Sequence, residues 1–476
     1  MVSQVKSVHP DVILGICCMS LLLVGMDVTI VNVALPAIQH DLHASVSGLQ
    51  WIMDSYTLVV ASLLMLAGSV SDRVGRRLVF QIGLSLFTAA SFLCSMAHNI
   101  EQLVAFRALQ GLGASMLNPV ALSIVANVFK DPKERARATG VWGAVGGVSF
   151  AVGPLLGGAL TQAIGWRSIF WVNVPLGILA VVLAAVFVPE SKAARGRRFD
   201  PVGQLLVFTG LTALTYAVIA GAHEGWSSRL IVGLFVVAAA SLVGFLVYEA
   251  KQAEPLVDLR FFRSVPFSSA TLLGLCAFAS FAGFLFLNAL YLQQVRGFSA
   301  FHTGLCTLPL AVTMMVFSPV SGRLVGVYGT RPSLLISGAG FMLGTLLLTG
   351  LSGGTPLWEL LLAYGLFGTG LGMVNPAITN NAVAGMPLAQ AGVAAAIAST
   401  SRQVGAALGV AIAGTVVSAS RASATGASNF AQATHPIWWV MTGCGTVVMF
   451  LGWASNTEWS RASAARAASL LGAQAA

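Results

Sequence analysis

Long apolar segments recur along this chain of 476 residues, and each is long enough to cross a lipid bilayer as a helix. One crossing needs about 20 mostly apolar residues. We expect fourteen such spans, which lie at residues 11–34, 48–70, 78–98, 101–126, 138–163, 168–188, 203–222, 229–249, 267–292, 302–325, 332–351, 357–378, 392–418 and 435–454. We therefore predict an all-α membrane protein.

The composition leaves little room for any other kind of domain. Hydrophobic residues make up 57% of the chain and charged residues 9%, whereas about 25% of residues are charged in soluble domains. We therefore expect a protein that is not an enzyme. The 51 glycines predict close helix packing, because small residues let membrane helices approach one another. The N-terminus has no clear cleavage site, so we expect the first span to be retained.

Basic residues are divided unevenly between the two sides of the predicted membrane. Short cytoplasmic loops collect Lys and Arg. If the N-terminus is cytoplasmic, four basic residues lie outside, at Arg167, Arg229, Arg296 and Arg421. Nineteen lie inside: Lys6, Arg73, Arg76, Arg77, Lys130, Lys133, Arg135, Arg137, Lys192, Arg195, Arg197, Arg198, Lys251, Arg260, Arg263, Arg323, Arg331, Arg461 and Arg466.

This charge distribution supports the number of spans and their orientation. Adding or removing one span would move every later loop to the other side. We therefore predict a multi-pass protein of a bacterial cytoplasmic membrane, with both termini in the cytoplasm. The basic residues form no single stripe, so we expect no nucleic-acid partner despite the net charge of +9.

Two internal repeats relate the first six spans to the last six. Residues 111–119 match residues 368–376 at an offset of 257, and residues 68–77 match residues 322–331 at an offset of 254. Two matches at nearly one offset favour duplication over a chance similarity of glycine-rich helices. Repeats of this kind build the two bundles of secondary transporters, which rock around a site near the middle of the membrane.

The repeats also predict how the chain is divided. We expect an N-terminal six-helix bundle at residues 1–190 and two additional transmembrane helices with their linkers at residues 191–262. A C-terminal six-helix bundle with a cytoplasmic tail should occupy residues 263–476. The protein is expected to act as a monomer.

Charged residues inside the spans are the first candidates for function, because ionisable side chains are costly in a bilayer. Asp27 lies deep in the first span, Asp54 in the second and Arg107 in the fourth. The last six spans have no acidic residue away from their ends. If a carboxylate carries protons, it therefore lies in the N-terminal half. Arg402 resembles Arg107 but lies nearer the cytoplasmic side, and its role stays open.

Each of these residues has more than one interpretation. We predict that Asp27 carries protons as the cavity alternates, with a permanent structural pair to Arg107 as the alternative. Arg107 could bias a neighbouring carboxylate toward its ionised form, or it could snorkel to the nearby outer surface. Asp54 could be a second proton carrier, a contact for a cation or a solvated residue of the outer vestibule.

A basic segment with two glycines follows the second span, and we predict that it forms a gating loop. Glycine permits a tight turn, and an aspartate can pair with an arginine or accept hydrogen bonds from a helix N-terminus. We expect a clasp that holds the two halves together on the cytoplasmic side. A loop that only fixes topology would explain the arginines but not the aspartate or the glycines. The residues are Gly68, Asp72, Arg73, Gly75, Arg76 and Arg77.

The fifth span contains Gly153, Pro154, Gly157 and Gly158. The proline removes a backbone donor and the glycines remove side-chain bulk, so the segment predicts a kinked and tightly packed helix. Gly and Pro also occur in membrane helices that have no gating role.

No cofactor or metal is expected. The six cysteines lie inside apolar runs without the spacing of metal ligands. Four phenylalanines of the ninth span do not form one narrow stripe, and we predict no substrate pocket from them; they are Phe278, Phe281, Phe284 and Phe286.

Together these segments resemble the major facilitator superfamily, and specifically its fourteen-span drug:proton antiporters. Residues 68–77 resemble the inter-helix loop motif of the superfamily, with Val70 where leucine is usual. Residues 103–113 are similar to the antiporter arginine motif. Residues 26–36 look like the first-span motif of the fourteen-span branch.

The fifth span strengthens this resemblance. Residues 149–158 resemble the motif associated with export rather than uptake, although Ser149 stands where glycine is common. The resemblance implies alternating access in which proton influx drives the export of lipophilic, often cationic, drugs or toxic compounds. The alternatives are an exporter dedicated to one metabolite, siderophore, amino acid or lipid, an importer, or a membrane protein that does not transport.

Overall fold

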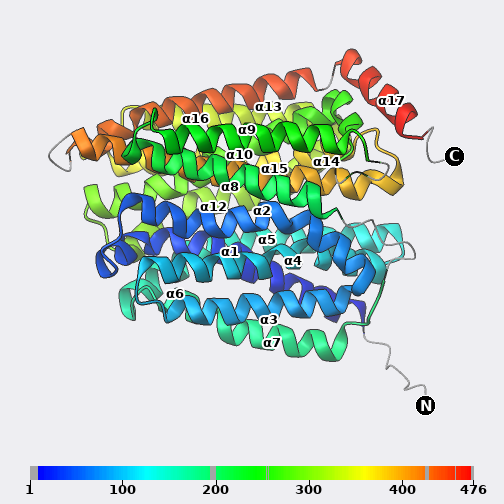
Figure 1. The fold of residues 1–476 in the computed structure, drawn as a ribbon, viewed down its shortest axis with the longest axis horizontal. Helices are drawn as coiled ribbons and strands as arrows, with labels where there is room; N and C mark the ends of the chain where they lie inside the picture. Colours follow the sequence, from blue (N-terminus) through cyan, green and yellow to red (C-terminus); the bar gives the residue numbers. More distant parts are fainter. Residues whose placement is uncertain are drawn as a thin grey trace.

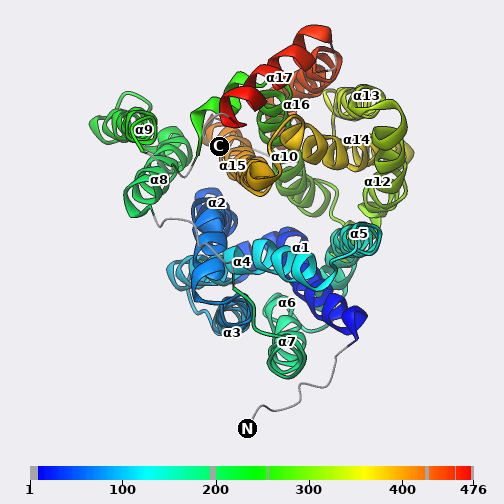
Figure 2. The same ribbon diagram turned by 90° about the vertical axis from the view of Figure 1, so that its right-hand side faces the viewer.

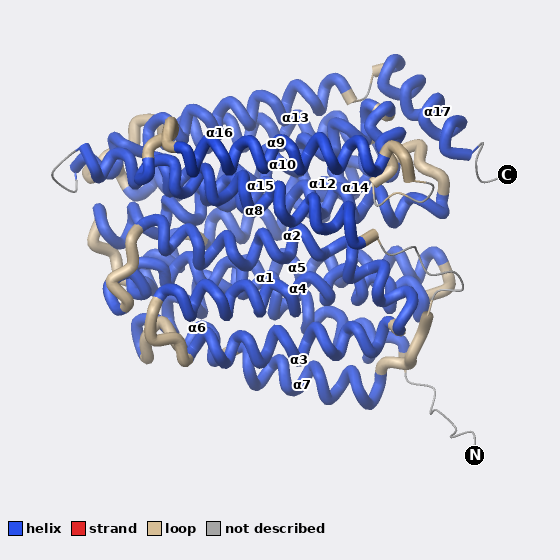
Figure 3. Tube along the Cα trace, viewed as in Figure 1, coloured by secondary structure: helices blue, strands red, loops and turns tan. Residues whose placement is uncertain are grey.

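The computed structural model describes residues 9–472 except 193–199, 253, 254, 256, 424–427 and 456. Four predicted cytoplasmic basic residues lie outside the described residues: Lys6, Arg195, Arg197 and Arg198. The described residues form helices joined by loops, and none of them forms a strand (Figure 3). The prediction of an all-α protein is confirmed.

Thirteen helical segments among the described residues are long and apolar enough to cross a membrane. The remaining predicted span, 392–418, lies within α15 (Leu388–Ser423), a helix of 36 residues. This helix carries a run of five polar residues, 399–403, near its middle, and the run includes Arg402 and Gln403.

The first half of the chain forms one group of helices, seen below the second half in Figure 2. Side-chain caps start several of its helices: Ser45 accepts a hydrogen bond from the Gly48 amide, and Asn99 accepts one from the Gln102 amide. Such caps satisfy backbone donors that a helix leaves free at its start. The helices are α1 (Pro10–Asp41), α2 (Val46–Val74), α3 (Arg76–Ser95), α4 (Ile100–Val128), α5 (Pro132–Ala163), α6 (Ser168–Trp171) and α7 (Asn173–Phe187).

The second half forms the other group. Besides α15, it contains η1 (Leu259–Arg263), α10 (Val265–Leu290), η2 (Tyr291–Val295), α11 (Ala300–Cys306), α12 (Leu308–Tyr328), α13 (Thr330–Leu348), α14 (Leu357–Val383), α16 (Ser428–Ala454) and α17 (Glu458–Gly472). The last helix, α17, was not predicted from the sequence. It packs against α10 and η1 at the end of the molecule where α1 begins (Figure 1).

Helices α8 (Pro201–Glu224) and α9 (Arg229–Glu249) form a pair beside the two groups (Figure 2). The side chain of Gln204 donates a hydrogen bond to the Ser62 carbonyl of α2. Thr415 of α15 donates from Oγ1 to the Val218 carbonyl of α8 at 2.8 Å. Helix α8 therefore contacts both halves.

The two halves are hydrogen-bonded to each other at the end where α1 ends and α2 begins, which we call the distal end. Gln293 donates from Nε2 to the Val33 carbonyl at 2.8 Å. Gln50 of α2 likewise donates from Nε2 to the Ala411 carbonyl of α15 at 2.7 Å. These bonds join the halves at the end opposite the first residue of α1.

Candidate functional site

Asp27 lies in the middle of α1, and its side chain is fully buried. Its Oδ2 atom accepts a hydrogen bond from Nη1 of Arg107 at 2.6 Å. Its Oδ1 atom accepts hydrogen bonds from Nε2 of Gln110 at 2.8 Å and from Nδ2 of Asn173 at 3.2 Å. Side chains from α4 and α7 therefore surround this carboxylate.

Arg107 is fully buried and turns inward rather than toward the surface. Its Nε atom donates to the Ile52 carbonyl of α2 at 3.2 Å, and its Nη1 atom also donates to Oε1 of Gln110 at 2.7 Å. Its Cζ atom lies 4.3 Å from the ring centroid of Tyr56, within the range of a cation–π contact. The structure thus contradicts the snorkelling interpretation.

Amide and hydroxyl partners that were not predicted from the sequence complete this cluster. Nδ2 of Asn173 also donates to Oγ of Ser91 at 3.1 Å. Gln110 was detectable, because it follows Arg107 by one helical turn, and Asn173 is an amide within an otherwise apolar run. We call Asp27, Arg107, Gln110, Asn173 and Ser91 the Asp27 network.

The Asp27 network couples several helices through one ion pair. Removing one member of such a buried pair typically costs about 3–5 kcal/mol, because the remaining charge is left uncompensated. The bidentate use of Asp27 and the several donors of Arg107 offset the cost of burying both charges.

Asp54 is also fully buried, but its surroundings are different. Neither of its carboxylate oxygens has a hydrogen-bond partner among the described residues. Gln50 precedes it by one turn and contacts α15, and residues four apart share a helix face. Asp54 therefore lies on the face of α2 that turns toward α15. Its burial contradicts the interpretation of a solvated vestibule residue.

The predicted gating loop, residues 68–77, is almost entirely helical. Helix α2 runs to Val74 and α3 begins at Arg76, so Gly75 alone separates them. Its φ of 137° is a conformation that favours glycine. Asp72 pairs with Arg76 across one turn, with Oδ1 2.9 Å from Nη2.

The turn at Gly75 is fixed to the chain that follows α7. Glu190 accepts hydrogen bonds from the backbone amides of Arg77 at 3.1 Å and Leu78 at 3.2 Å. A carboxylate at this position stabilises the N-terminus of α3 through the helix dipole. Glu190 follows the sixth apolar run and was not predicted as a site residue.

These contacts differ from the predicted clasp between the halves. In this structure Asp72 pairs with Arg76 of its own motif, and Arg77 contacts Glu190 of the same half. Arg73 is exposed in the last turn of α2. A Cβ added to Gly68 would meet nothing within 4 Å, so that glycine is not required by close packing here.

The glycines of the fifth span lie where α5 packs against α1 of its own half and against α11 of the other half. A Cβ at Gly157 would lie 2.9 Å from the Ile30 carbonyl oxygen of α1, and one at Gly153 would overlap Thr29. A Cβ at Gly158 would lie 2.5 Å from the Ala300 carbonyl oxygen of α11. The prediction of tight packing is therefore supported at these three positions, and α5 continues through Pro154 without ending.

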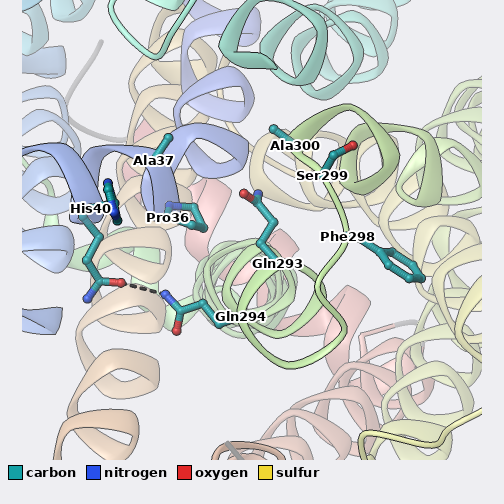
Figure 4. Close-up of a pocket in the computed structure, with 9 residues that line it drawn as sticks. Pro36, Ala37, His40, Gln293, Gln294, Phe298, Ser299 and Ala300 are labelled. Atoms are coloured by element: carbon teal, nitrogen blue, oxygen red, sulfur yellow. Dashed lines mark hydrogen bonds between the residues drawn. The ribbon is translucent and has the colours of Figure 1, made fainter.

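A pocket of about 490 Å³ lies between the halves at the distal end (Figure 4). On one side it is lined by the last residues of α1, including Gln39 and His40. On the other side lie Gln293 and Gln294, and Nε2 of Gln294 donates to Oε1 of Gln39 at 2.7 Å. This pocket was not predicted from the sequence, because the two halves must pack together to form it.

Among the described residues, no group of three His, Cys, Asp or Glu side chains could hold a metal ion. The cysteines are free thiols in or near packed helices.

Comparison with known proteins identifies the family to which this chain is related. Residues 17–410 match the model of the Major Facilitator Superfamily. The chain is 38% identical over 401 residues to the Multidrug resistance protein Stp of Mycobacterium tuberculosis, covering 84% of this chain and 74% of that protein. It is 36% identical over 424 residues to the Tetracenomycin C resistance and export protein of Streptomyces glaucescens, covering 87% and 77%.

Two further similarities agree with this assignment. The chain is 39% identical over 433 residues to the Puromycin resistance protein pur8 of Streptomyces alboniger, covering 90% of this chain and 84% of that protein. Its fold is similar to the crystal structure of the human organic anion transporter MFSD10 (TETRAN), with a TM-score of 0.63, 17% identity and coverage of 93% and 99%. The resemblance drawn from the sequence motifs is confirmed: this chain belongs to the major facilitator superfamily.

Proposed function

We propose that this protein exports lipophilic small molecules across a bacterial cytoplasmic membrane in exchange for protons. Its membership of a transporter superfamily and the resistance and export activities named for its relatives support export. The Asp27 network is the observation that carries the proton coupling. In this network a buried acidic side chain of a membrane helix is bound to a cationic side chain, and a proton can take the place of that cation on the carboxylate.

Protonation of Asp27 would remove the charge that holds Arg107. As a carboxylate, Asp27 accepts its present hydrogen bonds, but a neutral carboxyl group attracts a guanidinium far less strongly. Arg107 also donates to the Ile52 carbonyl of α2. A change at the ion pair therefore reaches α2 directly.

Helix α2 connects this change to the other half of the molecule. Ile52 is two residues from Gln50, which is hydrogen-bonded to the Ala411 carbonyl of α15. Asp54 follows on the same face as Gln50 and is a second candidate to bind a proton. Loss of the Arg107 contact would free α2 to tilt and would weaken the distal contact between the halves.

The remaining predicted features fit this cycle. The motif at residues 68–77 would gate the cytoplasmic side, and the glycines of α5 would form the tight antiporter helix against both halves. The divisions 1–190, 191–262 and 263–476 would act as two moving bundles with an additional helix pair. Both termini would face the cytoplasm, the distal end would face outward, and the protein would act as a monomer.

Transport in vesicles tests the proposal. Purified protein is reconstituted with an acidic lumen and an alkaline exterior, and uphill accumulation of ethidium and puromycin is measured. The wild-type protein should accumulate at least one of these probes, and Asp27→Asn should reduce the accumulation at least tenfold. Full accumulation by Asp27→Asn would overturn the assignment of Asp27.

Asp41→Asn is the matched control. Asp41 is the last residue of the same helix and also forms an ion pair, with its Oδ2 2.6 Å from Nη1 of Arg167. Its side chain is 47% exposed, so the pair contributes little to stability. This variant should keep the gradient-driven accumulation of the wild-type protein.

A further inference from the structure

Among the residues that the structure describes, four charged side chains lie well inside the membrane helices, and one of them is more accessible than the others. Asp27, Asp54 and Arg107 are each 0% exposed. Arg402 is partly accessible, although its helix, α15, packs against α2, α8, α10, α14 and α16. Arg402 is thus the charged side chain of this group that a solute between the helices could touch.

Arg402 lies well inside its helix and well inside the predicted span. It lies 10 residues after the first residue of the predicted span, 392–418, which corresponds to about 15 Å along the helix axis. Snorkelling arginines are found near helix ends, where the head group reaches water. The contacts of its side chain with α10 place it between packed helices.

The guanidinium lies beside α10 and has no acidic neighbour. A Cβ added to Gly274 of α10 would lie 3.4 Å from Cγ of Arg402, so the two helices are in close contact here. The Cζ atom of Arg402 lies 5.9 Å from the ring centroid of Phe278. Among the described residues, no salt bridge involves Arg402.

Aromatic rings extend from Arg402 across the boundary between the halves. The ring of Phe278 lies 6.2 Å from that of Phe281, and the ring of Phe281 lies 5.6 Å from that of Phe150 in α5. Phe281 is buried, whereas Phe278 and Phe150 are partly accessible. We call these three residues the aromatic row.

The guanidinium and the aromatic rings together indicate the class of ligand that this arrangement would bind. An uncompensated charge inside a membrane protein is costly and usually marks a functional site. A guanidinium binds a planar anion with two parallel hydrogen bonds, and aromatic rings favour edge-to-face or offset contact with another ring. An aromatic molecule with a negatively charged oxygen group satisfies both parts.

We propose that Arg402 and the aromatic row form a substrate subsite for aromatic organic anions. The carboxylate or phenolate of the substrate binds Arg402, and its rings lie against Phe278 and Phe150. Because Phe150 belongs to the N-terminal half, one bound molecule contacts both halves. This subsite rests on the proposed export function and adds aromatic anions to the lipophilic, often cationic, substrates expected from the sequence.

Binding of a matched pair of fluorescent probes tests the subsite. Anthracene-9-carboxylate and anthracene-9-carboxamide have the same rings, but only the first is an anion. The protein in lipid nanodiscs should bind the carboxylate at least tenfold more tightly than the amide. Arg402→Gln should abolish this preference while leaving the affinity for the amide within about twofold.

Two further variants separate charge recognition from misfolding. Arg402→Lys keeps the charge but not the planar fork, so it should retain part of the preference. Arg323→Gln removes an exposed arginine of the same half and should retain the whole preference. Equal affinity of the wild-type protein for the two probes, or an unchanged preference in Arg402→Gln, would overturn the subsite.

The dependence of transport on voltage separates this proposal from the function on which it rests. Export of one anion against entry of one proton moves two charges in the same direction, whereas exchange of one monovalent cation for one proton moves none. A membrane potential that is negative on the cytoplasmic side should therefore accelerate export of the anthracene carboxylate. If the pH gradient drives export of ethidium but not of the carboxylate, the export function stands and the anionic subsite is refuted.

Discussion

The two halves of the molecule fill corresponding positions with different chemistry. The match between residues 111–119 and 368–376 has an offset of 257, and the same offset relates three members of the Asp27 network to three aromatic residues. In the structure the ring of Phe284 stacks on Phe367 at 4.7 Å and meets Tyr364 edge-on at 5.1 Å. The pairs are Asp27 with Phe284, Arg107 with Tyr364 and Gln110 with Phe367.

Both trios hold two helices together, but only the trio of the N-terminal half is charged. Each trio joins the first helix of its half to the fourth span of that half, α1 to α4 and α10 to α14. The aromatic trio can hold these helices together but cannot exchange a proton near neutral pH, since an ordinary tyrosine has a pKa of about 10. The comparison leads us to expect proton chemistry in the N-terminal half and substrate recognition by Arg402 in the C-terminal half.

The largest effect should come from breaking the charged trio. Arg107→Leu leaves Asp27 buried without its cation and should lower the free energy of unfolding by about 3–5 kcal/mol. Thermal unfolding of the purified protein measures this loss. Adding Asp27→Asn to the same protein should recover part of it, because the uncompensated charge disappears. A single variant as stable as the wild type would show that the ion pair does not hold the half together.

A smaller loss of stability is expected at two glycines that occupy corresponding positions in the two halves, and it should be equal in both. A Cβ at Gly113 would lie 2.5 Å from the Phe87 amide nitrogen, and one at Gly370, at the corresponding position, would lie 2.8 Å from the Ser337 carbonyl oxygen. Gly113→Ala and Gly370→Ala should each destabilise the protein by about 1–3 kcal/mol through overpacking. Gly140→Ala is the control, since its Cβ meets nothing within 4 Å. Loss of stability in only one half would refute the shared packing.

The smallest effect should come from the aromatic trio. The hydroxyl of Tyr364 donates a hydrogen bond to Asn288. Tyr364→Phe removes this bond but keeps the ring, so stability should fall by about 0.5–1.5 kcal/mol. Gradient-driven export of ethidium should remain within about twofold of the wild-type rate. A loss as large as that expected for Asp27→Asn would contradict the division of tasks between the halves.

The sequence predicted the parts of the fold that depend on local pattern. Apolar runs of sufficient length located the helices, and isolated charges in those runs identified Asp27 and Arg107. The repeat was visible only where residues 68–77 match 322–331 and residues 111–119 match 368–376, so the correspondence of Asp27 with Phe284 needed the structure. Neither side chain belongs to a segment in which the two halves still match.

Features made by contacts between distant segments could not be predicted in this way. Asn173 reaches Asp27 across 146 positions in the chain, and no spacing rule connects them. The sequence predicted an arginine partner for Asp72 but not Arg76 in particular, since an arginine of any loop on that side has the right charge. The pocket at the distal end depends on how α1 meets η2, which only tertiary packing determines.

The position of α8 links the protein to the lipid around it. Through Gln204 it is bonded to one moving half, and through Val218 it is bonded to the other. If α2 and α15 separate by a few ångströms during the cycle, α8 must tilt or release one of these bonds, and acyl chains must fill or leave the space beside it. Bilayer thickness and lateral pressure would then act as a mechanical load on the transport rate.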